Sequence, residues 1–275
     1  MEKFSTSFLA YVSNICIVAG RVILEEYRKE GPKFSLKEDS SPVTDADLRA
    51  DEIIFENLYK LENSIPYISE ETTSSDENIS KEIFWAVDPL DGTKEFLKKT
   101  GDFTVNIGLI KENKPIFGIV YAPVFDMIWM GYTGEESNTT NSFHNERVSQ
   151  KQNPLENLKK ITVSLPQNEI SVVTSRSHPS VKTLQWIDQQ FKGKKTKVSQ
   201  RGSSIKICLI AEGKAHVYPR FGRTCIWDTA AAHAVLNGAG GFLGNIESFK
   251  ELTYLENIYN APFFASSYQL RKSQE

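Results

Sequence analysis

Two aspartates stand three residues apart at the end of a short apolar run, in the segment WAVDPLDGTKEF, residues 85–96. Carboxylates this close repel each other, so a cation or a bound proton must offset the repulsion. Pro89 disfavours helix at Asp88 and fixes the local turn, so both carboxylates can project to one side. The carbonyl of Leu90 can join them, and Mg²⁺ and Mn²⁺ prefer such oxygen ligands. The segment therefore predicts a metal cradle around Asp88, Asp91 and the Leu90 carbonyl.

The residues that follow this cradle suit a phosphate group. Gly92 permits a tight backbone, and a short helix can begin near Thr93, where helix N–H groups would favour a phosphate oxygen. Asp-Pro and Asp-Gly are also common turn pairs, so a purely structural turn stays open for DPLDGT alone. Phosphatases that form an aspartyl-phosphate use the spacing D-x-D-G-T. This chain has D-x-x-D-G-T, which disfavours a nucleophilic aspartate.

Three further acidic residues could complete the site. Glu70 follows a short apolar stretch in the segment ISEET. Asp47 stands in the first turn of an expected helix, where an acid can also simply complement the helix dipole. Asp228 stands at the start of an almost uncharged helix, WDTAAAHAV, where a helix cap and a metal ligand are equally open interpretations.

The elements that must position these residues follow two rhythms. An apolar strand at 83–87 delivers the aspartates, and an antiparallel meander over 103–132 follows it. Beyond a polar segment at 133–158, strands alternate with helices, which is typical of a layered α/β arrangement. We therefore expect an α+β half that carries the metal site, residues 1–150, and an α/β half that carries substrate-binding residues, residues 151–275.

Two helices are expected ahead of the aspartates. The first has apolar residues at helical spacing, which predict its buried face: Phe4, Phe8, Tyr11, Ile15, Val18 and Val22. Ser13, Asn14 and Arg21 interrupt this run, so we expect a core helix and no membrane span. The second helix should cover about 45–61, with Thr44 as its N-cap and with three inward residues, Leu48, Phe55 and Leu58.

The composition excludes several classes of protein. A chain of 275 residues that is 40% hydrophobic can bury a sizeable core. Its net charge of −3 gives no overall attraction for nucleic acid, so an anionic substrate would need local cations. Cys16, Cys208 and Cys225 are odd in number and widely spaced, which favours thiols in a reducing compartment over disulfides or a zinc site.

Four segments together carry a family resemblance: SPVTDAD, SEE, WAVDPLDGTKEF and WDTAAAHAVLNGAGG. In this order, and over almost the whole chain, they strongly resemble the lithium-sensitive, magnesium-dependent phosphatases, the family of inositol monophosphatase and fructose 1,6-bisphosphatase. The resemblance implies a combined α+β and α/β fold, a layered αβαβα sandwich. Within the family, GTKEF, TSRSH and GSSIKICLIAEGKAHVYPRFG look most like the bacterial branch of sulfur metabolism that hydrolyses adenosine 3′,5′-bisphosphate to AMP and phosphate.

The resemblance also implies a role for each site residue. It assigns five metal ligands: Glu70, Asp88, the Leu90 carbonyl, Asp91 and Asp228. Glu70 and Thr93 correspond to the groups that hold the attacking water, and Asp47 to the partner that makes the Thr93 hydroxyl more basic. The amides of Gly92 and Thr93 should hold a phosphate oxygen.

The second phosphate and the base of such a substrate need donors of their own. His178, Ser203, Lys206 and Arg220 correspond to the family's nucleotide-contacting region, and Asp228 borders it too. Each donor has an alternative role. His178 and Ser203 could cap helices, and Lys206 and Arg220 could be solvated.

The resemblance implies two or three Mg²⁺ ions per site, Mn²⁺ as a substitute, and inhibition by Li⁺ and Ca²⁺. It implies a small phosphorylated nucleotide as substrate and a cytoplasmic monomer or homodimer, with peripheral attachment to the cytoplasmic face of the inner membrane left open. Two other functions stay open: an inositol monophosphatase or sugar-bisphosphate phosphatase, which Lys94-Glu95 and SRSH disfavour, and a nucleotide-binding protein that has lost catalysis.

Overall fold

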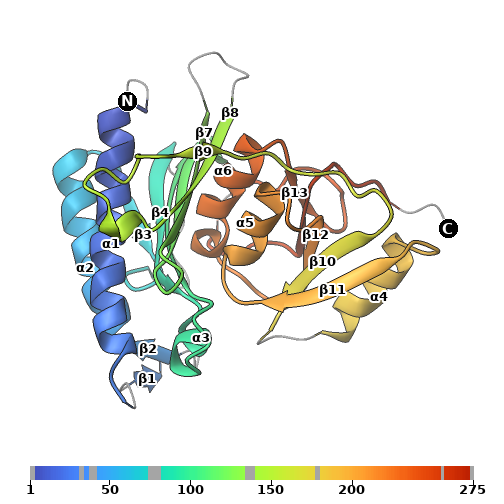
Figure 1. Ribbon diagram of the computed structural model, residues 1–275, viewed down its shortest axis with the longest axis horizontal. Helices are drawn as coiled ribbons and strands as arrows, with labels where there is room; N and C mark the ends of the chain where they lie inside the picture. Colours follow the sequence, from blue (N-terminus) through green and yellow to red (C-terminus); the bar gives the residue numbers. More distant parts are fainter. Residues whose placement is uncertain are drawn as a thin grey trace.

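The elements of the protein form five layers, α–β–α–β–α, in a computed structural model that Figure 1 shows with the layers running from left to right. Helices α1 (Thr6–Tyr27) and α2 (Asp45–Leu61) cover one face of a seven-stranded sheet. Helices α5 (Ile205–Ala211) and α6 (Ala230–Gly238) lie between this sheet and a five-stranded sheet, and α4 (Val181–Gln190) covers the far face of the second sheet. The layers confirm the αβαβα sandwich. The structure describes residues 4–30, 34–36, 42–73, 82–133, 140–176, 180–254 and 257–272.

The first sheet has the strand order β3-β4-β5-β6-β7-β8-β9, and only its β3–β4 pair is parallel. Its strands are β3 (Tyr67–Ser69), β4 (Ile83–Asp91), β5 (Thr104–Lys111), β6 (Lys114–Ala122), β7 (Met127–Thr133), β8 (Thr140–Glu146) and β9 (Lys159–Lys160). Strands β4 to β7 confirm the predicted strand and meander. The polar segment 133–158 contains β8 and a short 3₁₀ helix, η1 (Val148–Gln150), so the first sheet continues to Lys160. The division into halves at residue 150 stays a prediction.

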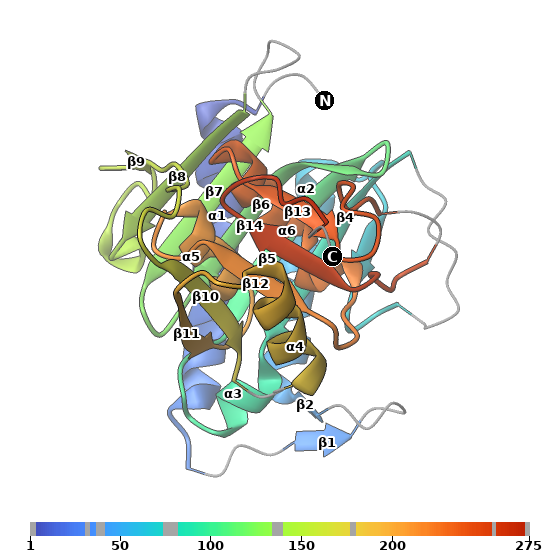
Figure 2. The same cartoon turned by 90° about the vertical axis from the view of Figure 1, so that its right-hand side faces the viewer.

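The second sheet has the strand order β11-β10-β12-β14-β13 and faces the viewer with α4 in Figure 2. Its strands are β10 (Ile170–Ser175), β11 (Thr196–Arg201), β12 (Val217–Arg220), β13 (Phe242–Asn245) and β14 (Phe263–Ser266). Strands β10, β11 and β12 are parallel, so their carboxyl ends meet at one edge, while β13 and β14 are antiparallel. A small ribbon, β1 (Phe34–Leu36) with β2 (Pro42–Thr44), leads into α2.

Helix α6 packs directly on the first sheet because glycines line its path. A Cβ atom added at Gly118 or Gly131 would clash with the backbone of α6 around Ala231 and Ala234, and one at Gly108 would touch Ala230. The alanine-rich helix can therefore approach closer than larger side chains would permit. This contact fixes the start of α6, and with it Asp228 two residues earlier, against the sheet that carries the other aspartates.

Helix α1 lies in the core, as expected, but it turns a different face inward. By length and composition it could cross a membrane, yet its buried residues pack inside the protein against α2, β5 and β6. Tyr11 and Val18, predicted to be buried, are exposed. Small residues set the contact face, because a Cβ atom at Gly20 would collide with Tyr121.

Helix α2 has the predicted bounds and the predicted N-cap. Thr44 and Asp47 form a capping box: the Thr44 N–H donates to Asp47 Oδ2 at 2.8 Å. Leu58 is buried as predicted, whereas Leu48 and Phe55 are exposed, so that part of the prediction was wrong. The buried stripe instead follows small residues, Ala46 and Ala50, that allow α2 close to its neighbours.

Candidate functional site

Strand β4 brings Asp88 and Asp91 to the same side of the sheet. Residues three apart on a regular strand point to opposite faces, because side chains alternate with a period of two. Here the register with β5 shifts between Asp88, opposite Asn106, and Asp91, opposite Thr104. This irregularity in DPLD turns the Asp91 carboxylate to the same side as that of Asp88, as β-bulges beside active sites redirect side chains. The turn therefore provides the geometry that the sequence predicted for it.

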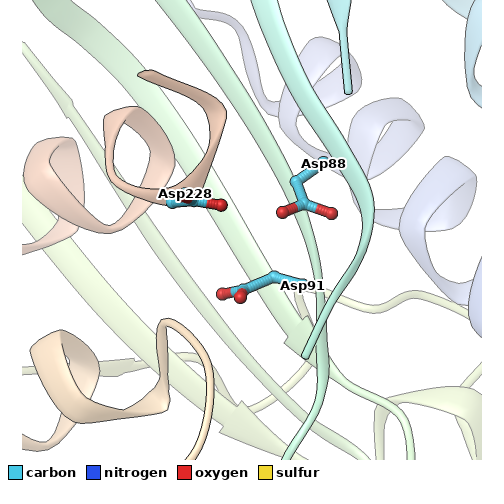
Figure 3. Close-up of side chains that lie close together, drawn as sticks. All are labelled: Asp88, Asp91 and Asp228. Atoms are coloured by element: carbon cyan, nitrogen blue, oxygen red, sulfur yellow. The ribbon is translucent and has the colours of Figure 1, made fainter. Parts of the chain in front are cut away.

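The third carboxylate comes from the other end of the chain. Asp228 ends a 3₁₀ helix, η2 (Ile226–Asp228), directly before α6, and its Oδ2 accepts the Cys225 N–H at 2.7 Å. Carboxylate oxygens of Asp88, Asp91 and Asp228 all lie within 4.8 Å of one another. We call these three residues the acidic centre, and Figure 3 shows their carboxyl groups facing a shared space.

The position of Asp91 is fixed by donors from β5 and from the N-cap of α5. Its Oδ2 accepts the Ser204 N–H at 2.6 Å, the Asn106 Nδ2–H at 3.2 Å and the Thr104 hydroxyl at 3.4 Å. Ser204 in turn donates its hydroxyl to the Asp228 carbonyl at 2.9 Å. Ser204 therefore joins both sides of the acidic centre.

The electrostatics of the acidic centre call for a cation. Burial, followed by the charges of Glu70 and Asp91, raises the pKa of Asp88 well above its usual range. Burial, Asp91 and Glu70 raise the pKa of Asp228 to about 7, and burial also raises the pKa of Asp91. The buried Oδ2 of Asp88 has no hydrogen-bond partner among the described residues. Clustered carboxylates with a buried, unpaired oxygen fit a hard divalent cation such as Mg²⁺ or Mn²⁺.

Glu70 lies beside the acidic centre but is not one of its three close members. It follows β3, and its N–H donates to Val87 O at 3.2 Å, one residue before Asp88. Its charge contributes to the raised pKa values of Asp88 and Asp228, so it lies within electrostatic reach of both. Its role as a ligand stays a prediction.

Thr93 and Asp47 meet as expected. The Thr93 hydroxyl lies 3.3 Å from Asp47 Oδ1 and 3.4 Å from the Leu90 carbonyl, and its single proton can be donated to either. Gly92, in the left-handed region at φ 101°, precedes α3 (Thr93–Leu97) as its N-cap. A Cβ atom at this position would also press on Asp102 O, so glycine suits both the conformation and the space.

The expected nucleotide contacts are only partly brought together. Lys206 is not solvated: it is 5% exposed, donates to Ser203 O at 2.5 Å, and burial lowers its pKa to about 8. Ser204 occupies the N-cap position of α5, while the Ser203 hydroxyl accepts the Ile205 N–H at the start of this helix at 3.4 Å. The charge of Arg220 offsets part of the rise that burial causes in the pKa of Asp228, and Arg220 borders a cavity of about 320 Å³. His178 lies outside the described residues.

Sequence reasoning missed the residues that support the ligands. Asn106 and Ser204 fix Asp91, and a polar residue inside the apolar run FTVNIGLI was the one available signal. In β3, just before Glu70, the hydroxyls of Tyr67 and Ser69 donate hydrogen bonds to Asp51 Oδ1 at 2.7 Å and 2.5 Å. Nothing in the sequence pairs Asp51 with that segment.

The chain is similar to known proteins over most of its length. Residues 6–261 match the model of the inositol monophosphatase family. The chain is 41% identical over 258 residues to the 3′(2′),5′-bisphosphate nucleotidase CysQ of Buchnera aphidicola subsp. Acyrthosiphon pisum, covering 90% of this chain and 89% of the relative. It is 39% identical over 255 residues to CysQ of Escherichia coli strain K12, covering 91% and 96%.

Solved structures agree as well. The crystal structure of CysQ from Bacteroides thetaiotaomicron, a bacterial member of the inositol monophosphatase family, matches with a TM-score of 0.80 at 32% identity and covers 98% of this chain and 99% of that chain. The inositol monophosphatase of Anabaena sp. PCC 7120 shares the fold, with a TM-score of 0.68 at 21% identity over 96% and 91% of the two chains. The chain therefore belongs to the inositol monophosphatase family.

Proposed function

We propose that this chain is a metal-dependent 3′(2′),5′-bisphosphate nucleotidase, which hydrolyses adenosine 3′,5′-bisphosphate to AMP and phosphate. The observation that carries the proposal is the acidic centre, in which Asp88 keeps a buried oxygen without a partner among the described residues. The choice of substrate is supported by relatives of 37–41% identity that are named for this activity. Two basic residues, Arg220 at the end of β12 and Lys206 in the first turn of α5, suit a substrate with two phosphates.

The acidic centre would hold Mg²⁺, two or three ions per site, through Asp88, Asp91, Asp228, Glu70 and the Leu90 carbonyl. Bound Mg²⁺ would lower the pKa of the attacking water and would offset the charge of the phosphate and the leaving oxygen. Mn²⁺, with similar ligand preferences, should substitute. Ca²⁺ should inhibit because its longer bonds and looser geometry misplace the reactants, and Li⁺ should inhibit because it offsets less charge.

The chain's own residues orient the reaction. When the Thr93 hydroxyl donates its proton to Asp47, its lone pairs can accept a hydrogen bond from the attacking water. The capping box holds Asp47 in place for this task. Glu70 would accept a hydrogen bond from the second hydrogen of that water. The amides of Gly92 and Thr93 would bind a phosphate oxygen at the start of α3. No covalent enzyme intermediate is required.

We further propose that the substrate is the principal partner and that the enzyme works in the cytoplasm as a monomer or homodimer. Peripheral contact with the inner membrane would rest on α1, which instead packs inside the protein.

A panel of phosphorylated substrates tests the proposal. Purified protein with Mg²⁺ should release phosphate from adenosine 3′,5′-bisphosphate much faster than from inositol 1-phosphate. A chelator should abolish the release, and Li⁺ should inhibit it. Preference for inositol 1-phosphate would assign the chain to another activity of its family, and absence of turnover on the whole panel would contradict an enzymatic function.

A further inference from the structure

Each of the three parallel strands of the second sheet ends at an arginine. Arg201 and Arg220 are the last residues of β11 and β12, and Arg176 directly follows β10. Ser175 is the register partner of Arg201, and the Arg176 N–H donates to Arg201 O at 3.1 Å, so these two arginines are neighbours. The carboxyl ends of parallel strands form the crevice in which open α/β sheets bind ligands.

One buried acid, Asp102, holds two of these arginines. Its side chain is 1% exposed and lies 2.9 Å from Arg176 Nη2 and 3.3 Å from Arg201 Nη1. Its Oδ2 also accepts the Gly202 N–H at 3.0 Å. Asp102 precedes β5, so it ties the edge of the second sheet to the first. Two guanidinium groups therefore share the one carboxylate of Asp102. We call Arg176 and Arg201 the arginine pair.

The arginine pair lies close to the acidic centre because one short segment joins them. Gly202 binds Asp102, and two residues later the Ser204 N–H binds Asp91. Two residues of extended chain span at most about 7 Å. A Cβ atom at Gly202 would clash with Asp102 and Glu95, so the glycine is what permits this close approach.

The two guanidinium groups remain accessible despite their buried partner. The side chains of Arg176 and Arg201 are 36% and 46% exposed. A guanidinium has five N–H donors, and the contact with Asp102 occupies only part of them. The residues before each arginine, Ser175 and Gln200, line the cavity of about 320 Å³ that Arg220 also borders. The pair is therefore adjacent along the chain to residues that line this cavity.

We infer that Arg176 and Arg201, fixed by Asp102, bind the phosphate that is not hydrolysed, the 5′-phosphate of the nucleotide. This inference rests on the proposed function, which places the 3′-phosphate at the acidic centre. A planar guanidinium matches the oxygens of a phosphate with two parallel N–H donors. Asp102 holds both side chains before the substrate arrives, which reduces the entropy lost on binding. Lys206, by contrast, is buried and bound to Ser203 O.

Two substrates that differ in one phosphate test the arginine pair. Arg176→Gln and Arg201→Gln should each lower kcat/KM for adenosine 3′,5′-bisphosphate by about 10- to 100-fold, mainly through KM. Turnover of 3′-AMP, which lacks the 5′-phosphate, should stay within about twofold of wild type. Arg176→Lys should recover part of the loss, since it keeps the charge without the fork. Arg49→Gln is the matched control, because Arg49 is also 46% exposed and paired with a carboxylate, Glu26 at 3.0 Å.

Equal losses on the two substrates, or no loss on the bisphosphate, would overturn the inference. A failure of the proposed function gives a different result, namely wild-type protein that hydrolyses no nucleotide. Calorimetry with AMP and adenosine then decides the role of the pair. Tighter binding of AMP than of adenosine in wild type, lost in both glutamine variants, supports it. No preference for AMP in wild type, or an unchanged preference in the variants, overturns it.

Discussion

The acidic centre and the arginine pair lie at the two ends of the segment 201–204, yet their charges are arranged in opposite ways. In the acidic centre, like charges converge: burial raises the pKa values of all three carboxylates, and repulsion from neighbouring carboxylates raises those of Asp88 and Asp228 further. In the arginine pair, one buried carboxylate offsets two half-exposed cations. A site for small, dehydrated cations can keep unfavourable charge in its interior until those cations bind. A site for a mobile anion keeps its charges near solvent, where desolvation costs less.

Asp91→Asn should have the largest effect, because it removes a charge from the acidic centre. It leaves the arginine pair unchanged. The amide oxygen can still accept the Ser204 N–H, but one charge of the cradle is lost. We expect both kcat/KM for adenosine 3′,5′-bisphosphate and the affinity for Mg²⁺ to fall. The fall in kcat/KM should exceed about 10²-fold, because groups that only support a metal ligand already cost up to about that much when they are lost. Phosphate release and Mg²⁺ calorimetry measure the two. Binding of AMP by the arginine pair should not weaken, and an unchanged Mg²⁺ affinity would contradict the assignment of Asp91.

Thr93→Ala should separate water activation from metal binding. We expect the rate constant for chemistry in single turnover to fall by about 10²-fold while Mg²⁺ and AMP binding stay nearly intact. Asp47→Asn should resemble it, and the double variant should be little worse than either single variant, because the two residues act as one unit.

Asp47 also serves the capping box, so its variant needs a control. Thr44→Ala removes the cap but not the contact between Asp47 and Thr93. It should lower the free energy of unfolding by about 1 kcal/mol and leave the chemical step within a few-fold of wild type. If the effects of Asp47→Asn and Thr93→Ala multiply, the two residues act independently and Thr93 is better interpreted as part of the helix start.

Metal removal should reveal the repulsion stored in the acidic centre. The pKa of Asp228 is raised to about 7 from 3.8, so between these values the folded metal-free protein binds more protons than the unfolded chain. The stability contribution of this group therefore rises as pH falls and is lost as pH rises through about 7. Allowing for the partial exposure of Asp228, we expect the free energy of unfolding to be higher by about 1–2 kcal/mol at pH 5.5 than at pH 7.5.

Chelated and Mg²⁺-loaded protein provide the comparison. Denaturant unfolding of both across this pH range isolates the contribution of the centre, because buried His233, whose lowered pKa is about 3, acts in the opposite direction in both forms. Mg²⁺ should also bind more tightly as pH rises through about 7, since its ligands must lose their protons. The same pH dependence with and without Mg²⁺ would show that the carboxylates do not carry this repulsion.

Salt should have the smallest effect and should act on the arginine pair. Exposed charges are screened within about 8 Å at physiological ionic strength, whereas buried ones are screened much less. Raising KCl at constant Mg²⁺ should increase KM for adenosine 3′,5′-bisphosphate by about two- to threefold more than KM for 3′-AMP, with kcat nearly constant. Initial rates on both substrates measure this, and an equal salt response would argue against a solvent-screened contact to the 5′-phosphate.

The sequence predicted the elements that carry local signals. Thr44 and the acidic first turn marked the start of α2, and the apolar run marked β4. Its errors concern which face of a helix is buried. Val18 and Phe55 fit an apolar stripe, but the small residues beside them allow closer packing and therefore lie inside. Apolar spacing gives a stripe on a helix, whereas the partner's shape selects the contact face.

By itself, the sequence determined which residues could bind a metal and to which family they belong, because a DPLD turn and its companion motifs are local patterns of residue type. Only the tertiary structure decided that Asp228 faces Asp88 and Asp91, since this depends on the irregularity in β4 and on α6 packing against sheet glycines. Only the tertiary structure paired Asp102 with Arg201, ninety-nine residues away. Such contacts join two sheets that fold on separate stretches of chain, and their geometry follows from packing, which no local pattern encodes.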